Sequence, residues 1–437
     1  MVIHWWLLIN LRFTVWPEMM SYPYLFNRGF RLYSDFIYPY TPLLTWVLSV
    51  LYKIFGYKLA VVQTFSWSLV LVNDVLIYLM VRRLIKKEWP AFFSVLVYVF
   101  LQPFSEGNMV WFDVVVVTPL LTGLYFLTKK NYLWAGMALG MAVMIKQTAG
   151  LYIMFGVLYV FYGERKLESL KRFVVFPVLL GISLLGYVLL TNSINEFANW
   201  TLVYPFTQWS NFPGYVQMAL GSREKVMLIL LVLPVMFLRT KNVSDNFLLL
   251  LFLIGGLISV YPRFSWFHMQ AAIAFLVIIY GVVLAERRYL APVFGVVLVG
   301  VMLFNHRYVW GTDWQKEARF RGEEDIRRAM IISNKVGIDE SVFLVGEQSG
   351  LYTIANRQPV MPWTDNFGWY LEIPGVQEKI LSRWKTEGLN WVIWRESKDG
   401  ESELGYYQPH LISKWIEANY NKGEMIWEGT YLWERKD

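Results

Sequence analysis

The first 305 residues alternate between long apolar runs and short polar segments. Within each run the apolar residues follow one another directly instead of alternating with polar ones. Continuous runs of this kind are typical of membrane-spanning α-helices, which need roughly 20 residues each. Several of the runs are shorter than that and must extend into their flanks. The runs are Tyr57–Val81, Trp89–Leu101, Phe112–Leu127, Leu133–Ile145, Ala149–Tyr162, Phe173–Leu190, Val226–Leu238, Phe247–Val260, Met269–Leu284 and Tyr289–Phe304.

Two segments affect the number of spans. Residues Leu133–Tyr162 form one apolar stretch, which we divide at Lys146 because a charge interrupts it there. The segment Met1–Trp16 is mostly apolar but too short for a good span, and it fits a first helix whose beginning lies upstream of this sequence. The sequence therefore predicts an all-α polytopic membrane bundle of about 10–11 transmembrane helices.

The positive charges favour one orientation of this bundle. Alternate connections between the runs carry 14 lysines and arginines, whereas the opposite connections carry seven. Because basic residues are enriched on the cytoplasmic side, we expect residues 17–56 to form the first outer loop. Within that loop the short apolar segment Leu43–Phe55 is expected to lie along the membrane interface.

The chain changes character at His306. Residues 1–305 hold 23 basic and 12 acidic residues and carry a net charge of +11, whereas residues 306–437 hold 17 basic and 21 acidic residues and carry −4. We therefore divide the chain into a transmembrane domain, residues 1–305, and a small C-terminal domain, residues 306–437. The orientation places the C-terminal domain on the extracytoplasmic side of the cell membrane.

The C-terminal domain is predicted to be α/β. It contains no phosphate loop, dinucleotide fingerprint or HExxH motif. The segment Trp363–Phe367 is a candidate acceptor surface. Helical periodicity marks Glu323–Lys335, Val376–Glu387 and His410–Asn419, and strand-like runs are Ser341–Gly346, Tyr352–Ala355, Asn390–Arg395 and Met425–Trp433.

Composition supports the membrane interpretation. The chain is 56% hydrophobic and 17% charged, against roughly 45–50% and about 25% in soluble domains. Membrane lipids are therefore its expected surroundings. The absence of cysteine excludes disulfides, thiolate metal sites and a cysteine nucleophile. The C-terminal domain has no basic stripe with stacking aromatics, so no nucleic-acid partner is expected.

Acidic residues gather at the outer ends of the predicted helices. Glu18 and Asp35 flank an aromatic, proline-rich stretch of the first outer loop. A carboxylate at the membrane–water boundary can act as a general base toward an acceptor hydroxyl, although helix capping or solvation explains such acids equally simply. The second outer connection adds Glu106, Asn108 and Asp113, and an acid at the position of Asp113 also suits a helix N-terminus.

Three cationic candidates face the same side in this topology. A lysine in a span pairs with an acid or lines a polar cavity, so Lys146 has an anionic lipid headgroup, Asp74 or Asp113 as alternative partners. Asp74 itself lies near mid-span, which favours an interhelical hydrogen bond. Arg263 is a forked donor suited to phosphate, and His268 opens the next run. An interfacial arginine whose head reaches water is the simpler alternative for Arg263.

The order of these features resembles the GT-C superfamily of integral-membrane glycosyltransferases, which use polyprenyl-phosphate sugars. Relatives include protein O-mannosyltransferases and the aminoarabinose transferase that acts on lipid A. The resemblance covers most of residues 1–305. It rests on the acidic first outer loop with its Tyr33-Ser34-Asp35-Phe36 and Pro42-Leu43-Leu44 elements, the second loop with Asn108 and Asp113, the helix pair at Ala135–Ala149, and the late loop Tyr261–His268.

The resemblance implies an inverting transfer from a polyprenyl-phosphate-linked hexose or pentose to a lipid, glycan or protein hydroxyl. The family base is an acid of the first outer loop, commonly within an Asp-Glu pair. Here Pro17 precedes Glu18, so we favour Asp35 as the base, with Glu18 second. Family members often carry a lysine in this loop that binds the phosphate, but the stretch Tyr40-Thr41-Pro42 has none. The resemblance therefore implies that Arg263, Lys146 or His268 contacts the phosphate.

Some relatives bind a divalent cation near the acidic loops. Glu18, Asp35, Asp113 and His268 offer oxygen and imidazole ligands for one, but no spacing in this sequence requires it. No other cofactor is expected. The alternative functions are a polyprenyl-linked glycan ligase or polymerase and a lipid flippase or transporter, although no pair of matched broken helices in two repeats marks a transporter.

Overall fold

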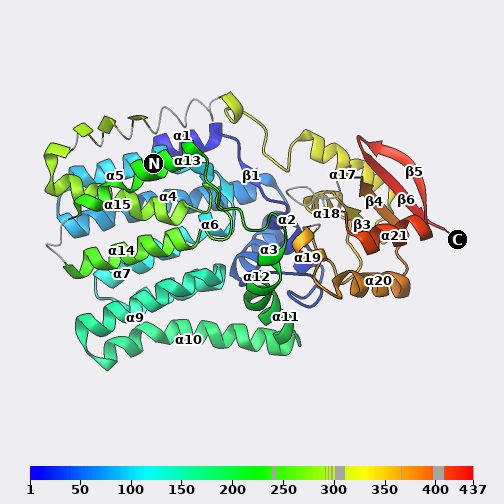
Figure 1. Ribbon diagram of the computed structural model, residues 1–437, viewed down its shortest axis with the longest axis horizontal. Coiled ribbons are helices and arrows are strands. Elements are labelled where there is room, and N and C mark those ends of the chain that lie inside the picture. Colours follow the sequence, from blue (N-terminus) through cyan, green and yellow to red (C-terminus); the bar gives the residue numbers. More distant parts are fainter. Residues whose placement is uncertain are drawn as a thin grey trace. The chain divides into compact units, whose positions relative to one another are not determined.

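The chain is described here by a computed structural model, which describes residues 1–238, 243–290, 292–293, 295–296, 299–300, 311–365, 367–396 and 408–436. They form two compact units, and Figure 1 labels the helices and strands of both. The first unit comprises Met1–Thr14, Val62–Leu184 and Gln217–Lys316, and the second comprises Val15–Val61, Leu185–Val216 and Glu317–Asp437. The predicted domain boundary at His306 lies outside the described residues.

The first unit is helical, and its helices overlap the predicted apolar runs, apart from the run Tyr289–Phe304, which lies largely outside the described residues. The expected break at Lys146 is confirmed, since a helix ends at Ile145 and the next begins at Gly150. The helices are α1 (Val2–Asn10), α4 (Leu59–Ile85), α5 (Glu88–Leu101), α6 (Phe112–Val115), α7 (Val117–Thr128), α8 (Tyr132–Ile145), α9 (Gly150–Glu164), α10 (Leu167–Leu190), α13 (Ser222–Val232), α14 (Val243–Ile258) and α15 (Gln270–Glu286).

Two of these helices, α4 and α10, are long and apolar enough by themselves to cross a membrane. The other apolar helices of this unit within the described residues are shorter, with 17 residues at most. A mostly helical first unit is therefore confirmed, while the expected number of spans stays a prediction.

The core of the first unit is built around α15. Every residue from Gln270 to Ala285 is buried, and the helix packs against α5, α14 and α7. A helix that is apolar on all sides has no face for water and must be enclosed by other helices. Enclosure of α15 fixes the position of His268, which lies two residues before it.

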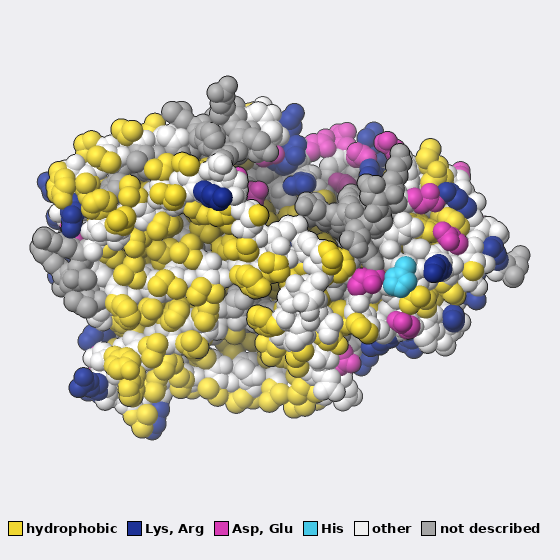
Figure 2. Space-filling model, in the orientation of Figure 1, with side chains coloured by type: hydrophobic (Ala, Val, Ile, Leu, Met, Phe, Trp, Pro, Cys, Tyr) yellow, Lys and Arg dark blue, Asp and Glu magenta, His cyan; other side chains and the backbone are white. Residues whose placement is uncertain are grey.

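Large apolar side chains cover much of the outer surface of the helical unit, where yellow dominates Figure 2. On α9 these include Met154 and Leu158, and on α10 Val178 and Ile182, each more than 40% exposed. Contiguous exposed apolar surface of this extent marks a membrane or protein interface.

The mid-span acid Asp74 forms the expected interhelical bond. Its Oδ1 lies 3.0 Å from Nδ1 of His4 on α1, and both side chains are fully buried. The other imidazole nitrogen of His4 lies 3.2 Å from Oε1 of Gln102, whose amide nitrogen donates to the carbonyl of Gly107. This polar chain ties α1 to α4 and to the turn after α5.

The second unit combines the first outer loop with the C-terminal part. The helix α3 has exactly the range Leu43–Phe55 expected for the short segment of that loop, whereas its interfacial placement stays a prediction. The helix α2 packs against α3 and α18. The helices are α2 (Glu18–Asn27), α3 (Leu43–Phe55), α11 (Ile194–Ala198), α12 (Tyr204–Thr207), α17 (Glu323–Lys335), α18 (Gly350–Ala355), α19 (Gly368–Leu371), α20 (Val376–Glu387) and α21 (His410–Asn419).

A four-stranded sheet confirms the α/β prediction for the C-terminal part. The strands are β3 (Val342–Val345), β4 (Trp391–Arg395), β5 (Tyr420–Trp427) and β6 (Thr430–Arg435), in the order β3-β4-β6-β5. The strands β3 and β4 are parallel, and the other neighbours are antiparallel. The three predicted helices of this part have the expected bounds.

Two strand predictions were wrong. Residues Tyr352–Ala355 belong to the helix α18, which ends where Asn356 adopts a left-handed conformation. A run of four residues is too short for periodicity to separate helix from strand. The single strand expected at Met425–Trp433 is a hairpin, because Gly429 at φ +71° reverses the chain between β5 and β6.

Close packing of α8 on α10 generates a stability prediction. A Cβ on Gly136 would lie 1.8 Å from the backbone oxygen of Phe173, so Gly136→Ala must push these helices apart. We expect a loss of about 1–3 kcal/mol in unfolding free energy, measured by thermal unfolding in lipid nanodiscs. Gly181→Ala on α10 meets no atom within 4 Å and should be neutral or slightly stabilising; equal effects of the two substitutions would contradict the packing.

Candidate functional site

Glu18 begins α2 and lies directly after Pro17. An acid in the first turn is favoured by the helix dipole, but this one is only 5% exposed. Among the described residues, its Oε2 atom has no hydrogen-bond partner. An ionised carboxylate in such a position would lose most of its hydration without compensation. The site therefore favours the protonated form of Glu18.

A second buried acid, Asp365, acts on Glu18. Asp365 accepts a hydrogen bond of 2.9 Å from the hydroxyl of Tyr22 and another from Ser349. Burial, followed by the negative charge of Asp365, raises the pKa of Glu18 to about 8. Burial also raises the pKa of Asp365, to about 6, against the lowering effect of its two hydroxyl donors. Near neutral pH the pair therefore holds one proton, on Glu18.

Asp35 is held differently, by an arginine. Both carboxylate oxygens accept from the Arg31 guanidinium, with Nε–Oδ2 and Nη2–Oδ1 distances of 2.9 Å, and the Arg31 amide donates to Oδ2 at 2.7 Å. This bidentate geometry orients the carboxylate strongly. The backbone carbonyl of Asp35 accepts from the amide of Trp363 at 2.8 Å. The loop around Asp35 is thus fastened to the C-terminal part of its unit.

The first unit contains a buried ion cluster. Asp113, in the short helix α6, lies 2.6 Å from Nζ of Lys146 and 3.0 Å from Nδ1 of His268, with one of these nitrogen atoms beside each carboxylate oxygen. Lys146 adopts an extended conformation that ends α8, and this break lets its ammonium group turn toward Asp113. Of the alternative partners for Lys146, Asp113 is confirmed.

The remaining candidates are more dispersed. Arg263 is half-buried, and its Nη2 donates to Oε1 of Gln217 at 2.9 Å. Glu106 is exposed and has a φ of 54° in the turn after α5. Asn108 is buried, accepts from the indole of Trp67, and donates to the carbonyls of Leu8 and Leu11. A structural role accounts for the Asn108 amide, so its contact with substrate stays a prediction.

The sequence predicted that these residues surround one outer cavity. The structure brings Asp113, Lys146 and His268 together in one unit, and it places Glu18 and Asp35 in the other. Their convergence on one cavity stays a prediction. Sequence reasoning missed the influence of Asp365 on Glu18. The one signal in the sequence that could have indicated this influence was the position of Asp365 within the candidate surface Trp363–Phe367. Residue 366 of that segment lies outside the described residues.

Metal binding is not indicated by the candidate acids. Within the part of the chain that the structure describes, no three His, Cys, Asp or Glu side chains lie close enough together to hold a metal ion. No metal is therefore used in the function proposed below.

Part of the chain matches a known family. Residues 39–191 match the model described as dolichyl-phosphate-mannose-protein mannosyltransferase. This range covers the latter part of the first outer loop, the helices α3 to α9, and α10, and it includes Asp113 and Lys146. Among curated protein sequences, none matches the chain significantly.

Solved structures match the chain along nearly its whole length. ArnT from Cupriavidus metallidurans is 13% identical over 99% of this chain and 96% of ArnT, with TM-scores of 0.61 in the apo state and 0.65 bound to undecaprenyl phosphate. The Archaeoglobus fulgidus oligosaccharyltransferase, tethered with an acceptor peptide containing the NVT sequon, is 10% identical over 99% of this chain and 70% of its own, with a TM-score of 0.52.

At these identities the similarity establishes the fold. ArnT and the oligosaccharyltransferase are both GT-C glycosyltransferases. The whole-chain structural match and the family match to residues 39–191 agree with each other. The resemblance drawn from the sequence to the GT-C membrane glycosyltransferases is therefore confirmed: the chain shares the fold of ArnT, and residues 39–191 match the protein mannosyltransferase model.

Proposed function

We propose that the protein transfers a hexose or pentose from a polyprenyl-phosphate donor to the hydroxyl group of a lipid, glycan or protein acceptor. The observation that carries this proposal is the match of 99% of the chain to ArnT bound to undecaprenyl phosphate. The setting is a multi-pass bundle of about 10–11 spans in the cell membrane. The reaction takes place on the extracytoplasmic side, where the charge pattern puts the first loop and the C-terminal domain.

In the proposed reaction, a first-loop carboxylate takes the proton of the acceptor hydroxyl. The freed oxygen attacks the anomeric carbon as the bond from that carbon to the phosphate oxygen breaks, and the configuration inverts. The lipid phosphate leaves with the bonding electrons. Its developing charge needs preorganised cationic donors, each of which is worth roughly 3–4 kcal/mol of barrier in comparable enzymes.

Asp35 is the base that we favour. A base must be positioned for proton transfer, and the Arg31 fork fixes the orientation of the Asp35 side chain. Glu18 keeps its proton at neutral pH because burial and Asp365 raise its pKa to about 8. It is therefore the weaker candidate below that pH.

Lys146, His268 and Arg263 are the proposed cationic donors to the phosphate. Lys146 and His268 both contact the carboxylate of Asp113, which offsets the charge of Lys146 in the absence of an anion and fixes the positions of both side chains. Arg263 offers further donors beside Gln217. Glu106 and Asn108 remain candidate contacts of the second loop.

The choice of base can be tested by following polyprenyl phosphate release from a panel of donors. We expect Asp35→Asn to lower the rate by about 10²–10⁴-fold and Glu18→Gln to have a smaller effect. Exposed Asp339→Asn serves as the matched control. Arg31→Gln separates chemistry from structure, because an Asp35 that serves only to anchor Arg31 would make the two variants equally defective. Absence of release from every donor by folded wild-type protein would instead favour a ligase, polymerase or flippase.

The role of Lys146 can be separated from its pairing with Asp113. Lys146→Met should lower the rate by about 10²–10³-fold, although the buried Asp113 left behind also destabilises the fold. The double variant Asp113→Asn/Lys146→Met removes both charges and should recover thermal stability but not activity. Recovery of activity in the double variant would mean that Lys146 acts only as the partner of Asp113. The control is Lys171→Met, at an exposed lysine, which should leave both activity and thermal stability unchanged.

The proton on Glu18 makes stability depend on pH. Because the folded-state pKa of about 8 exceeds the usual value of 4.5, the folded chain binds more protons across this interval. Its unfolding free energy should fall as pH rises from about 5 to 8, with a slope of up to about 1 kcal/mol per pH unit. Thermal unfolding should show this in wild-type protein and much less in Glu18→Gln. The exposed variant Glu378→Gln should retain the full slope, and retention of it by Glu18→Gln would contradict the buried proton.

A further inference from the structure

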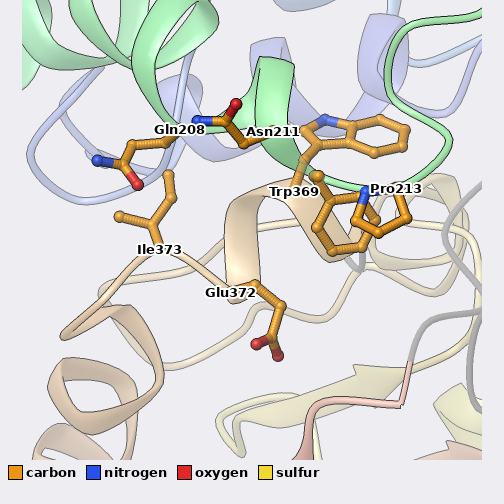
Figure 3. Close-up of a pocket in the computed structure, with 7 residues that line it drawn as sticks. Gln208, Asn211, Pro213, Trp369, Glu372 and Ile373 are labelled. Carbon is orange, nitrogen blue, oxygen red and sulfur yellow. The ribbon is translucent and has the colours of Figure 1, made fainter.

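A pocket in the second unit is unrelated to the carboxylates described above. Its volume is about 320 Å³, at the lower end of the range for small-molecule sites. One wall comes from the segment after α12 and the other from α19 and the residues that follow it (Figure 3). The lining residues are Gln208, Asn211, Phe212, Pro213, Trp369, Glu372 and Ile373.

Trp369 gives this pocket a rigid aromatic wall. Its indole stacks on Phe367, with ring centres 4.6 Å apart, and meets the edge of Tyr215 at 5.6 Å. Phe212, on the facing segment, lies 6.3 Å from the same indole in a T-shaped arrangement. Aromatic rings held on several sides keep one orientation, so the exposed part of the indole offers a fixed flat surface.

Amide groups lie beside this surface. The amide nitrogen of Asn211 donates to the carbonyl of Thr207 at 2.9 Å, and the side chain also has an acceptor oxygen, Oδ1. No described residue hydrogen-bonds to the side-chain amide of Gln208, which supplies both donors and an acceptor. In Figure 3, Gln208, Asn211 and Trp369 lie on one side of α19, whereas the carboxylate of Glu372 extends to the other side, at the edge of the pocket.

We propose that this pocket binds a sugar ring of the acceptor, an assignment that rests on the transferase function proposed above. A sugar ring has an apolar C–H face, which packs on an indole, and hydroxyl groups, which pair with amides. None of the seven lining residues is basic, and the edge carries Glu372. A phosphate-linked donor would meet no lysine or arginine among the lining residues, and this is why we assign the pocket to a neutral acceptor glycan.

Direct binding tests the site without the reaction. Saturation-transfer NMR on the full-length protein in nanodiscs, with methyl glycosides of neutral hexoses and pentoses and no donor, should show binding. Gln208→Ala should weaken it by about five- to tenfold, the value of one or two hydrogen bonds, and Trp369→Ala should abolish it. The neighbouring exposed residue gives the control, since Thr207→Ala should bind as wild type.

A second experiment tests whether binding depends on the charge of the sugar. Glucuronate should bind with lower affinity than glucose. The variant Glu372→Gln should reduce this difference in affinity, whereas Glu378→Gln on α20 should leave it unchanged. Equal binding by wild type, Gln208→Ala and Trp369→Ala would overturn the sugar site. Sugar binding that responds to these variants in a protein that releases no polyprenyl phosphate from any donor would instead overturn the transferase function and leave the pocket standing.

Discussion

Buried carboxylates are the constraint on which the rest of this structure depends. Removing a carboxylate from water is costly unless it is paired, hydrogen-bonded or protonated. The chain buries several carboxylates and offsets this cost in different ways. Asp74 contacts His4, Asp35 is paired with the guanidinium of Arg31, and Asp113 contacts Lys146 and His268. Glu18 retains its proton instead. Each solution fixes the position of a helix end or loop, so the electrostatic compensation also determines local geometry.

The first outer loop depends on the C-terminal part for its shape. Tyr22 donates to Asp365, Ser21 hydrogen-bonds Ser349, and Asp35 and Trp363 are joined through their backbones. A loop with this many polar and aromatic groups would otherwise be costly to order. Residues that are more than 300 positions apart thus form one compact unit, and a change in the C-terminal part acts directly on both candidate bases.

Much of this could be predicted from sequence where the signal is local. The helix α3, the break at Lys146 and the helices α17, α20 and α21 follow from apolar periodicity, glycine and charge within a few residues. The helix α18 could not be predicted, because its short run fits a strand as well. Long-range pairs also escaped prediction: Asp113 was only one of several partners for Lys146, and nothing near Glu18 in the sequence points to Asp365.

The environment of Glu18 bears on the proline that precedes it, Pro17. The family resemblance leads one to expect two adjacent acids, and this chain has a proline before Glu18. A second buried carboxyl, that of Asp365, does act on Glu18 from the C-terminal part of the chain and raises its pKa. Since the pair holds one proton near neutral pH, it carries a single negative charge rather than two. An acid that holds its proton at rest is suited to a structural role or to proton donation, and this is why we propose Asp35, which Arg31 orients, rather than Glu18 as the base.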